Sequence, residues 1–356
     1  MTKRVSVKQE LAQHNIDALL VTRPENLRYL TGFTGGPDGA CLVTGERLVL
    51  LTDFRYQEQA RVQSPSCELI IVTEGYAAAL HDISKKHGLH RIGYEGDVMT
   101  CSQFATYQKK LNFCTFVSVS GLIEKKRMIK QPFEIERIQK ASAISQLAFS
   151  EILELLKPGV QERDIALELD YRMRKHGAEK SSFDTIVVAG KNSSLVHGEP
   201  GGYCFQNGDF ILMDFGCVYE GYCSDMTRTV ALGKVSQRQR EVYQIVLDAQ
   251  RAALEALVPG RELREIDKVA RDRIAEAGFG DCFGHSLGHG VGLEIHEQPT
   301  LSPKSVGALR DGMVVTVEPG IYLEQEFGVR IEDLVVIGQD SAENLCKGTK
   351  KELIAL

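Results

Sequence analysis

Apolar and polar positions alternate in short blocks along the first third of the chain. Short apolar runs there separate segments of helical or turn character, such as residues 54–62 and 75–86. The apolar runs that we expect to form strands are residues 17–21, 40–43, 48–51, 69–72 and 116–119. Strands that alternate with helices are typical of α/β domains. We therefore expect residues 1–123 to fold as an α/β unit.

A change of pattern follows this unit. Residues 124–132 are charged and end in a proline, and apolar residues then recur at three-residue spacing, which predicts an amphipathic helix. The apolar positions of this helix are Ile135, Ile138, Ala141, Ile144 and Leu147. We place a domain boundary here, so that residues 1–123 and 124–356 form two domains.

The second domain contains an internal repeat. Pro158-Gly159 and Pro259-Gly260 are 101 positions apart, and each pair is followed by a helical apolar stripe that stops at a glycine. These stripes are Ile165, Leu169 and Met173 before Gly177, and Ile266, Val269 and Ile274 before Gly278. Further on, HGEP at 197–200 matches HEQP at 296–299, and NGDFILMDFG at 207–216 matches DGMVVTVEPG at 311–320. Each half thus predicts two helices, a loop with a histidine, and a strand that ends in a carboxylate.

The repeat relates four carboxylates to one another. Asp214 and Glu318 occupy equivalent positions, and Asp225 and Glu332 follow them after 11 and 14 residues. Two symmetry-related pairs are expected to meet at a pseudo-two-fold axis. Four carboxylates brought together repel one another unless cations neutralise them, so the pattern predicts metal ions.

The neighbouring residues support a metal site. On the two-residue period of a strand, Thr227 shares a face with Asp225, and Arg330 shares one with Glu332. His289 would add an imidazole ligand to the set. Oxygen ligands with one imidazole suit Mn²⁺, Co²⁺, Fe²⁺ or Mg²⁺ better than a closed zinc site, and we favour Mn²⁺ or Co²⁺.

Two metal ions indicate a hydrolase, because they activate water and polarise a scissile carbonyl. Each candidate residue alone is more often a turn, cap or surface residue than a ligand. The combination carries the inference: His285, His289 and His296 fall within twelve residues, beside the repeat-related carboxylates. The glycine-rich segment 288–292 does not match a phosphate-binding loop. No G-x-S-x-G motif indicates a serine hydrolase.

Composition narrows the choice of partners and compartment. The 356 residues are 43% hydrophobic and 25% charged, as in ordinary globular proteins, and the net charge of -6 gives no footprint for nucleic acid. No stretch approaches the length of a membrane span, so we expect no membrane partner. The nine cysteines form no CxxC pair, which favours reduced thiols and the cytoplasm.

Several motifs resemble one family closely. Five segments of the second domain resemble the pita-bread metallopeptidases of the aminopeptidase P and prolidase branch. These segments are MDFG at 213–216, YCSDMTRT at 222–229, GHGVGLEIHE at 288–297, VEPG at 317–320 and VRIED at 329–333. RYLTGFT at 28–34 and TDFRYQEQ at 52–59 resemble the N-terminal creatinase-like domain of that family. The resemblance implies an α+β fold: a creatinase-like α/β domain, then a pita-bread domain with a pseudo-two-fold repeat.

The resemblance also implies residue roles. Asp214 would bind one metal ion, Asp225 and Glu332 would bridge two, and His289 and Glu318 would complete the second site. The ions would be Mn²⁺ or Co²⁺, with Fe²⁺ or Zn²⁺ as alternatives. Glu318 matches the proton shuttle of the family.

Three further histidines and one arginine match family positions. His197, His285 and His296 match imidazoles that line the substrate pocket, and Arg330 matches the arginine that supports the last carboxylate. His296 is our choice of donor to the oxyanion of the tetrahedral intermediate. His197 follows Val196, where relatives commonly have proline, so its role depends on how that loop sits.

The activity expected from this resemblance is an Xaa-Pro aminopeptidase, which acts on peptides with proline at the second position. The nearest alternative is an Xaa-Pro dipeptidase, or prolidase, with the same ligands and a closed cleft beyond the proline. A scaffold that has lost catalysis and creatinase-type chemistry without metal are disfavoured by the five ligand-type residues. Methionine aminopeptidases are disfavoured by the N-terminal domain. Relatives often dimerise through that domain, which implies a homodimer.

Overall fold

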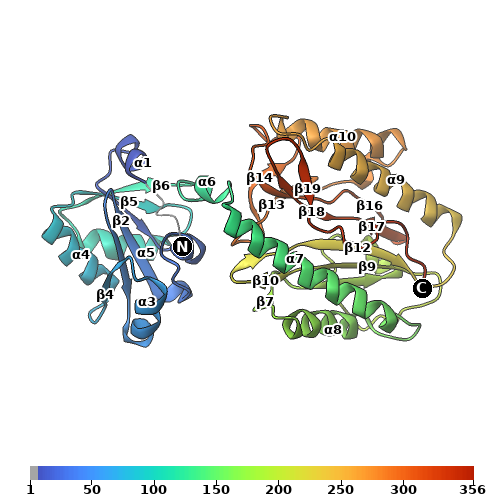
Figure 1. Cartoon of the computed structure of the whole chain (residues 1–356), viewed down its shortest axis with the longest axis horizontal. Coiled ribbons are helices and arrows are strands. Elements are labelled where there is room, and N and C mark those ends of the chain that lie inside the picture. The colour runs from blue at the N-terminus through green and yellow to red at the C-terminus, as the bar shows by residue number, and fades with distance from the viewer. Residues whose placement is uncertain (1–6) are drawn as a thin grey trace. The chain divides into compact units, whose positions relative to one another are not determined.

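The structure, a computed structural model, describes residues 7–356 of the chain. It divides into two compact units, one ending at Arg127 and one spanning Met128–Leu356 (Figure 1). Helix α6 (Glu124–Arg127) closes the first unit. The division into an N-terminal domain of residues 1–123 and a catalytic domain of residues 124–356 remains a prediction.

The first unit is built around a six-stranded sheet with the order β4-β3-β2-β1-β5-β6. The sheet is mixed, because β1 pairs antiparallel with β2 and parallel with β5. Its strands are β1 (Ala18–Val21), β2 (Gly39–Thr44), β3 (Leu48–Thr52), β4 (Glu68–Ile71), β5 (Arg91–Glu95) and β6 (Thr115–Val119). Its longer helices are α1 (Lys8–Gln13), α2 (Pro24–Thr31), α3 (Gln57–Gln63), α4 (Tyr76–His87) and α5 (Cys101–Lys110). Every residue of β1 and β3 is buried, as expected for a sheet covered on both faces.

All five strands predicted in this unit are confirmed, and β5 is the one that the apolar pattern missed. Its sequence contains Gly93, a residue type that is depleted in strands. A Cβ atom on Gly93 would lie 2.5 Å from the side chain of Ile16. The side chains of the core therefore lie close against this position, which glycine fits without any shift of the Ile16 side chain.

Two helix pairs cover the sheets of the second unit. Helix α7 (Pro132–Ile152) packs on α8 (Glu162–Lys175), and α9 (Gln237–Glu255) packs on α10 (Leu263–Glu276). In Figure 1, α9 and α10 lie on one side of the strands and α8 lies on the other. The predicted apolar stripes are largely confirmed. Two positions differ: Leu147 is 45% exposed while the neighbouring Ala148 is buried, and Ala270 is buried while Val269 is only partly buried.

The predicted repeat appears in the backbone. Gly159 and Gly260 have φ angles of 89° and 86°, which glycine adopts without the steric cost that other residues pay. After each of these turns the chain makes an antiparallel bridge, Gln161 to Cys204 in one half and Glu262 to Ala308 in the other. The repeat therefore extends to matched long-range contacts.

The two halves also share a sheet pattern. One sheet has the order β12-β9-β8 and a larger one the order β14-β13-β15-β18-β19, so that β9 and β15 hold equivalent places between antiparallel neighbours. These strands are β8 (Ile186–Ala189), β9 (Phe210–Phe215), β12 (Met226–Ala231), β13 (Gly288–Gly290), β14 (Glu297–Leu301), β15 (Val314–Val317), β18 (Asp333–Ile337) and β19 (Ala342–Asn344). The remaining strands are β7 (Lys180–Ser181), β10 (Cys217–Tyr219) and β11 (Tyr222–Cys223), and the hairpin of β16 (Gly320–Leu323) and β17 (Phe327–Arg330).

Candidate metal centre

The first pair of carboxylates lies on two neighbouring strands. Asp214 is the fifth residue of β9, and the antiparallel register places Thr227 of β12 directly opposite it. Asp225 immediately precedes β12. The excursion through β10 and β11 thus returns the chain beside Asp214, which brings Asp225 to the same end of the strand pair.

The second pair follows the same plan. Glu318 comes directly after β15, and the β15–β18 register pairs Val317 with Asp333, so Glu332 emerges opposite Glu318. His289 lies on β13, the other neighbour of β15. Its backbone N–H donates to the hydroxyl of Thr316 at 3.0 Å, and that hydroxyl also contacts a carboxylate oxygen of Glu318 at 3.0 Å.

These elements bring together all five predicted ligands. One donor atom from each of Asp225, His289 and Glu332 lies within 4.8 Å of the other two. His289 Nε2 is 3.5 Å from Asp225 Oδ2 and 3.3 Å from Glu318 Oε1. Asp214 joins the group through Arg330, whose Nη2 lies 2.6 Å from Asp214 Oδ2.

The donor atoms fit a divalent cation. Within residues 7–356, Asp214 Oδ1 and Glu332 Oε1 are buried and have no hydrogen-bond partner. A buried carboxylate oxygen without a partner is costly, and a metal ion would satisfy it. His289 Nδ1 lies 3.1 Å from the carbonyl oxygen of Gly290, which only accepts. Nδ1 therefore carries a proton, and Nε2 is the ring nitrogen available to a metal ion. In the metal-free protein, burial would lower the pKa of His289, but the hydrogen bond and charge of Glu318 outweigh it and raise this pKa, which favours the protonated ring.

Electrostatics separate the carboxylates into two kinds. Burial raises the pKa of Asp225 well above its ordinary value, and the carboxylate of Glu332 raises it further. Burial and the charge of Glu318 do the same to the pKa of Glu332. Burial would raise the pKa of Glu318 too, but the hydrogen bond and charge of His289 outweigh it, and this pKa lies below its ordinary value. The site is therefore a concentration of negative charge that protons or metal ions must balance.

Arg330 and Thr227 hold the ligands from behind. The Thr227 hydroxyl donates to Glu332 Oε2 at 2.7 Å and accepts from Arg330 Nε at 3.1 Å. The same guanidinium contacts Asp214 and donates through Nη1 to the hydroxyl of Tyr322 at 2.7 Å. One buried arginine thus connects ligands from both repeats.

Sequence reasoning missed two supporting residues. Tyr322 gives no local signal, because its contact with Arg330 depends on the pairing of β16 with β17. Thr316 was within reach, since it stands two positions before Glu318 on a strand, the spacing that had pointed to Thr227.

The three other predicted histidines occupy different places. His296 is solvent-exposed, and its ring centroid lies 4.4 Å from that of His289. Burial of part of the ring and the neighbouring His289 lower the pKa of His296, so a neutral imidazole faces the site near pH 7. His197 is exposed, and a charge on its ring would lower the pKa of His296.

His285 is the most enclosed of the three. Its Nε2 lies 3.0 Å from the Tyr322 hydroxyl and its Nδ1 lies 2.8 Å from the Ser286 carbonyl oxygen, so both ring nitrogens contact protein atoms. Burial lowers its pKa. Its predicted place in the substrate pocket stays a prediction.

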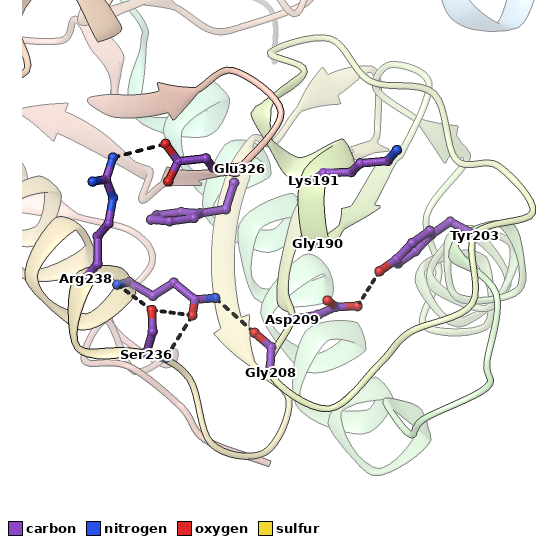
Figure 2. A pocket seen from close by; sticks show the side chains of 10 residues that line it. Gly190, Lys191, Tyr203, Gly208, Asp209, Ser236, Arg238 and Glu326 are labelled. Carbon is purple, nitrogen blue, oxygen red and sulfur yellow. Dashed lines mark hydrogen bonds and ion pairs between the residues drawn. The ribbon is translucent and has the colours of Figure 1, made fainter.

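One well-formed hollow of the second unit lies away from these residues. It has a volume of about 480 Å³, is lined by Lys191, Tyr203 and Arg238 among others, and contains none of the predicted site residues. Figure 2 shows hydrogen bonds or ion pairs between several of its polar groups, including those of Tyr203 with Asp209 and of Arg238 with Glu326. The hollow is therefore separate from the candidate metal centre.

This fold and site define a class of protein. The family model described as metallopeptidase family M24 matches residues 136–339, and that of the creatinase/prolidase N-terminal domain matches residues 4–129. The chain belongs to metallopeptidase family M24 and is a peptidase with the pita-bread fold that its sequence implied.

Individual relatives are similar over nearly the whole chain. An Xaa-Pro dipeptidase of Pyrococcus furiosus is 38% identical over 342 residues, which cover 96% of each chain. Among solved structures, an Xaa-Pro dipeptidase from Bacillus anthracis has a TM-score of 0.95 at 41% identity, covering 98% of this chain and 97% of the other. An X-Pro aminopeptidase from Thermotoga maritima has a TM-score of 0.90 at 37% identity, covering 98% of this chain and all of the other.

Between residues 7 and 356, none of the helices combines the length and apolar character needed to cross a bilayer.

Proposed function

We propose that this protein is a metal-dependent Xaa-Pro dipeptidase that hydrolyses dipeptides with proline as the second residue. The observation that carries the proposal is the cluster of Asp225, His289 and Glu332, with carboxylate oxygens that lack partners, in a chain similar to Xaa-Pro dipeptidases from end to end. The sequence alone favoured an Xaa-Pro aminopeptidase. The similarity to dipeptidases supports the alternative better, and the aminopeptidase of Thermotoga maritima keeps the first reading as the second candidate.

The proposed metal ligands are Asp214, Asp225, His289, Glu318 and Glu332. Two divalent ions, Mn²⁺ or Co²⁺ by preference, would supply polarisation of the scissile carbonyl and activation of a water molecule. Oxygen donors with one imidazole support this choice of ions.

We assign the proton transfer to Glu318. Its carboxylate lies 3.3 Å from His289 Nε2 within the ligand cluster, and an ionised carboxylate there can accept the proton of the attacking water. The scissile bond before proline is a tertiary amide, and its nitrogen must gain a proton as it leaves as a secondary amine. Glu318 can return the proton to that nitrogen, which balances the hydrolysis.

We assign stabilisation of the oxyanion to His296. It is exposed and neutral near pH 7, and it stands beside His289, so an N–H group is available to the carbonyl oxygen. His197 is proposed as a second contact with the substrate. A homodimer and a cytoplasmic location remain predictions, and the nine free cysteines support the latter.

Two substrates distinguish the candidate activities. Metal-stripped protein resupplied with Mn²⁺ would be given Ala-Pro and Ala-Pro-Ala, with Ala-Ala as the control without proline. We expect release of alanine from Ala-Pro alone. Release from the tripeptide at a similar rate would make the protein an aminopeptidase, and release from none of the three would contradict both activities.

A further inference from the structure

The C-terminal segment lies against the strand that carries Thr227. The N–H of Ala231, at the end of β12, donates to the carbonyl oxygen of Ile354 at 2.8 Å, and the N–H of Leu356 donates to the carbonyl oxygen of Ala231 at 2.9 Å. The hydroxyl of Tyr243 on α9 donates to the carbonyl oxygen of Lys351 at 2.6 Å. The segment is thus hydrogen-bonded to two elements of the second unit, β12 and α9.

Between this segment and the candidate metal centre lies a buried arginine. Arg228 is 1% exposed, and its Nη1 donates to the carbonyl oxygens of Thr227, at 2.9 Å, and of Glu332. Its Nη2 donates to Asp333 Oδ1 at 2.8 Å and to the Thr349 hydroxyl at 2.6 Å. One guanidinium therefore contacts the backbones of both Thr227 and Glu332, two residues whose side chains meet at the site, and it adds to the direct hydrogen bond from the Glu332 N–H to the Thr227 carbonyl oxygen.

Asp333 holds the other side of this arginine and is itself held by the C-terminal segment. Lys351 Nζ lies 3.0 Å from Asp333 Oδ2, which also accepts from Gln250 at 2.9 Å and from Asn344 at 2.6 Å. The Asp333 side chain is fully buried, whereas that of Lys351 is 25% exposed. We call Arg228, Asp333, Thr349 and Lys351 the charged platform. Its two cations and one carboxylate leave a net positive charge beneath the acidic cluster.

We propose that Lys351 and Thr349 are positioning residues of the metal centre, which act through Arg228 on the spacing of Thr227 and Glu332. Thr349 fixes one N–H group of Arg228, and Lys351 supplies a second cation for Asp333, so that Arg228 remains free to hold both carbonyl oxygens. The planar fork of arginine suits this task, because it reaches carboxylate and carbonyl acceptors at fixed angles. The inference rests on the proposed metal centre.

A purely structural role for the charged platform makes a different prediction. It would lower the melting temperature of the protein when Lys351 is removed, but the folded protein would bind metal as before. A positioning role lowers metal affinity in protein that is still folded. Measuring both quantities on one set of variants separates the two roles.

The variants are Lys351→Met, Lys351→Arg and Thr349→Val, with Lys350→Met as the control, since Lys350 is an exposed neighbour. Each metal-stripped full-length protein is titrated with Mn²⁺ by calorimetry and melted without metal. We expect Lys351→Met and Thr349→Val to bind Mn²⁺ roughly tenfold more weakly than the wild type. Removing a residue that supports a metal ligand typically weakens metal binding about 10- to 100-fold, and these residues act at one further step. Lys351→Arg should restore binding, and Lys350→Met should match the wild type.

Two results would overturn the proposal in distinguishable ways. Wild-type binding with equally tight binding by Lys351→Met and Thr349→Val would refute the positioning role alone. A wild-type protein that binds no Mn²⁺ would refute the metal centre of the proposed function, and the positioning role with it.

Discussion

The Thr227 hydroxyl donates a 2.7 Å hydrogen bond to the carboxylate of Glu332, a residue 105 positions away in the chain. The backbones of the two residues are joined as well, since the N–H of Glu332 donates to the carbonyl oxygen of Thr227 at 3.1 Å. Thr227 stands opposite Asp214 of the first repeat, and Glu332 belongs to the second. This contact therefore fastens the two halves of the site to each other.

Replacing Thr227 with valine tests this contact. The change keeps the shape of a buried strand residue but removes the donor to Glu332 and the acceptor from Arg330. We expect Mn²⁺ affinity or turnover of Ala-Pro to fall by roughly 10- to 100-fold, as for other groups behind metal ligands. Thr227→Ser, which keeps the hydroxyl, is the matched control. Equal affinity and turnover in wild type and Thr227→Val would show that the Thr227 hydroxyl contributes neither to metal binding nor to catalysis.

The bridging role proposed for Asp225 and Glu332 predicts a larger loss. Asp225→Ala or Glu332→Ala removes a ligand that is needed for several kcal/mol of transition-state stabilisation, so turnover should fall by at least about a thousandfold. The fold should persist, because neither residue is part of the apolar core. Circular dichroism and Ala-Pro hydrolysis would be compared with those of Glu324→Ala, a change at an exposed position. Unchanged activity in either ligand variant would exclude that residue from the site.

The stability of the metal-free protein should depend on pH through Glu332. Because its folded-state pKa is raised, the folded protein keeps a proton that the unfolded chain has already lost, and stability falls as pH rises through this range. Each unit of the upward shift costs about 1.4 kcal/mol once the pH exceeds the raised pKa. Glu332→Gln cannot lose this proton. Its melting temperature in chelator should therefore exceed that of the wild type by an amount that grows as the pH rises from the ordinary pKa of glutamate toward the raised pKa of Glu332. Parallel curves for the two proteins would contradict the raised pKa.

The five ligand candidates could be predicted because short sequence motifs reveal the internal repeat. Pro-Gly turns, the histidine loops and two similar ten-residue segments reveal that Asp214 and Glu318 are equivalent before any contact is known. Most strands of the first unit could be predicted for the same reason, since apolar runs are local. β5 could not, because Gly93 interrupts its apolar run, and the side chain of Ile16 that packs close to Gly93 comes from far away in the chain.

Thr227 and Arg330, which lie behind the ligands, could be predicted from strand periodicity. Tyr322 and Arg228, in contrast, could not be predicted from sequence. The contacts of Tyr322 depend on the pairing of two strands, and those of Arg228 depend on three segments that meet only in the folded protein. Glu332-Asp333 could have been an exposed strand end by sequence alone. The structure buries both residues, and Asp333 faces Arg228 and Lys351 rather than the ligand cluster.

Tyr322→Phe tests whether the connection from Arg330 to His285 affects catalysis. The change removes the hydroxyl that accepts from Arg330 and contacts His285 at 3.0 Å, while the ring remains. Arg330 keeps its bonds to Asp214 and Thr227, so we expect Mn²⁺ affinity to change by less than about threefold and kcat to fall roughly tenfold. Steady-state kinetics on Ala-Pro would separate kcat from KM, with the exposed Tyr171→Phe as control. A normal kcat would show that this connection only supports the fold.

We propose that the five clustered residues bind two divalent ions on which peptide hydrolysis depends. The most direct measurement is a titration of metal-stripped protein with Mn²⁺ that follows bound metal and proline release from Ala-Pro in the same samples. We expect about two ions bound per chain, with hydrolysis absent before metal is added and rising as the sites fill. Full hydrolysis by the metal-free protein, or occupied sites without hydrolysis of any proline-containing peptide, would contradict it.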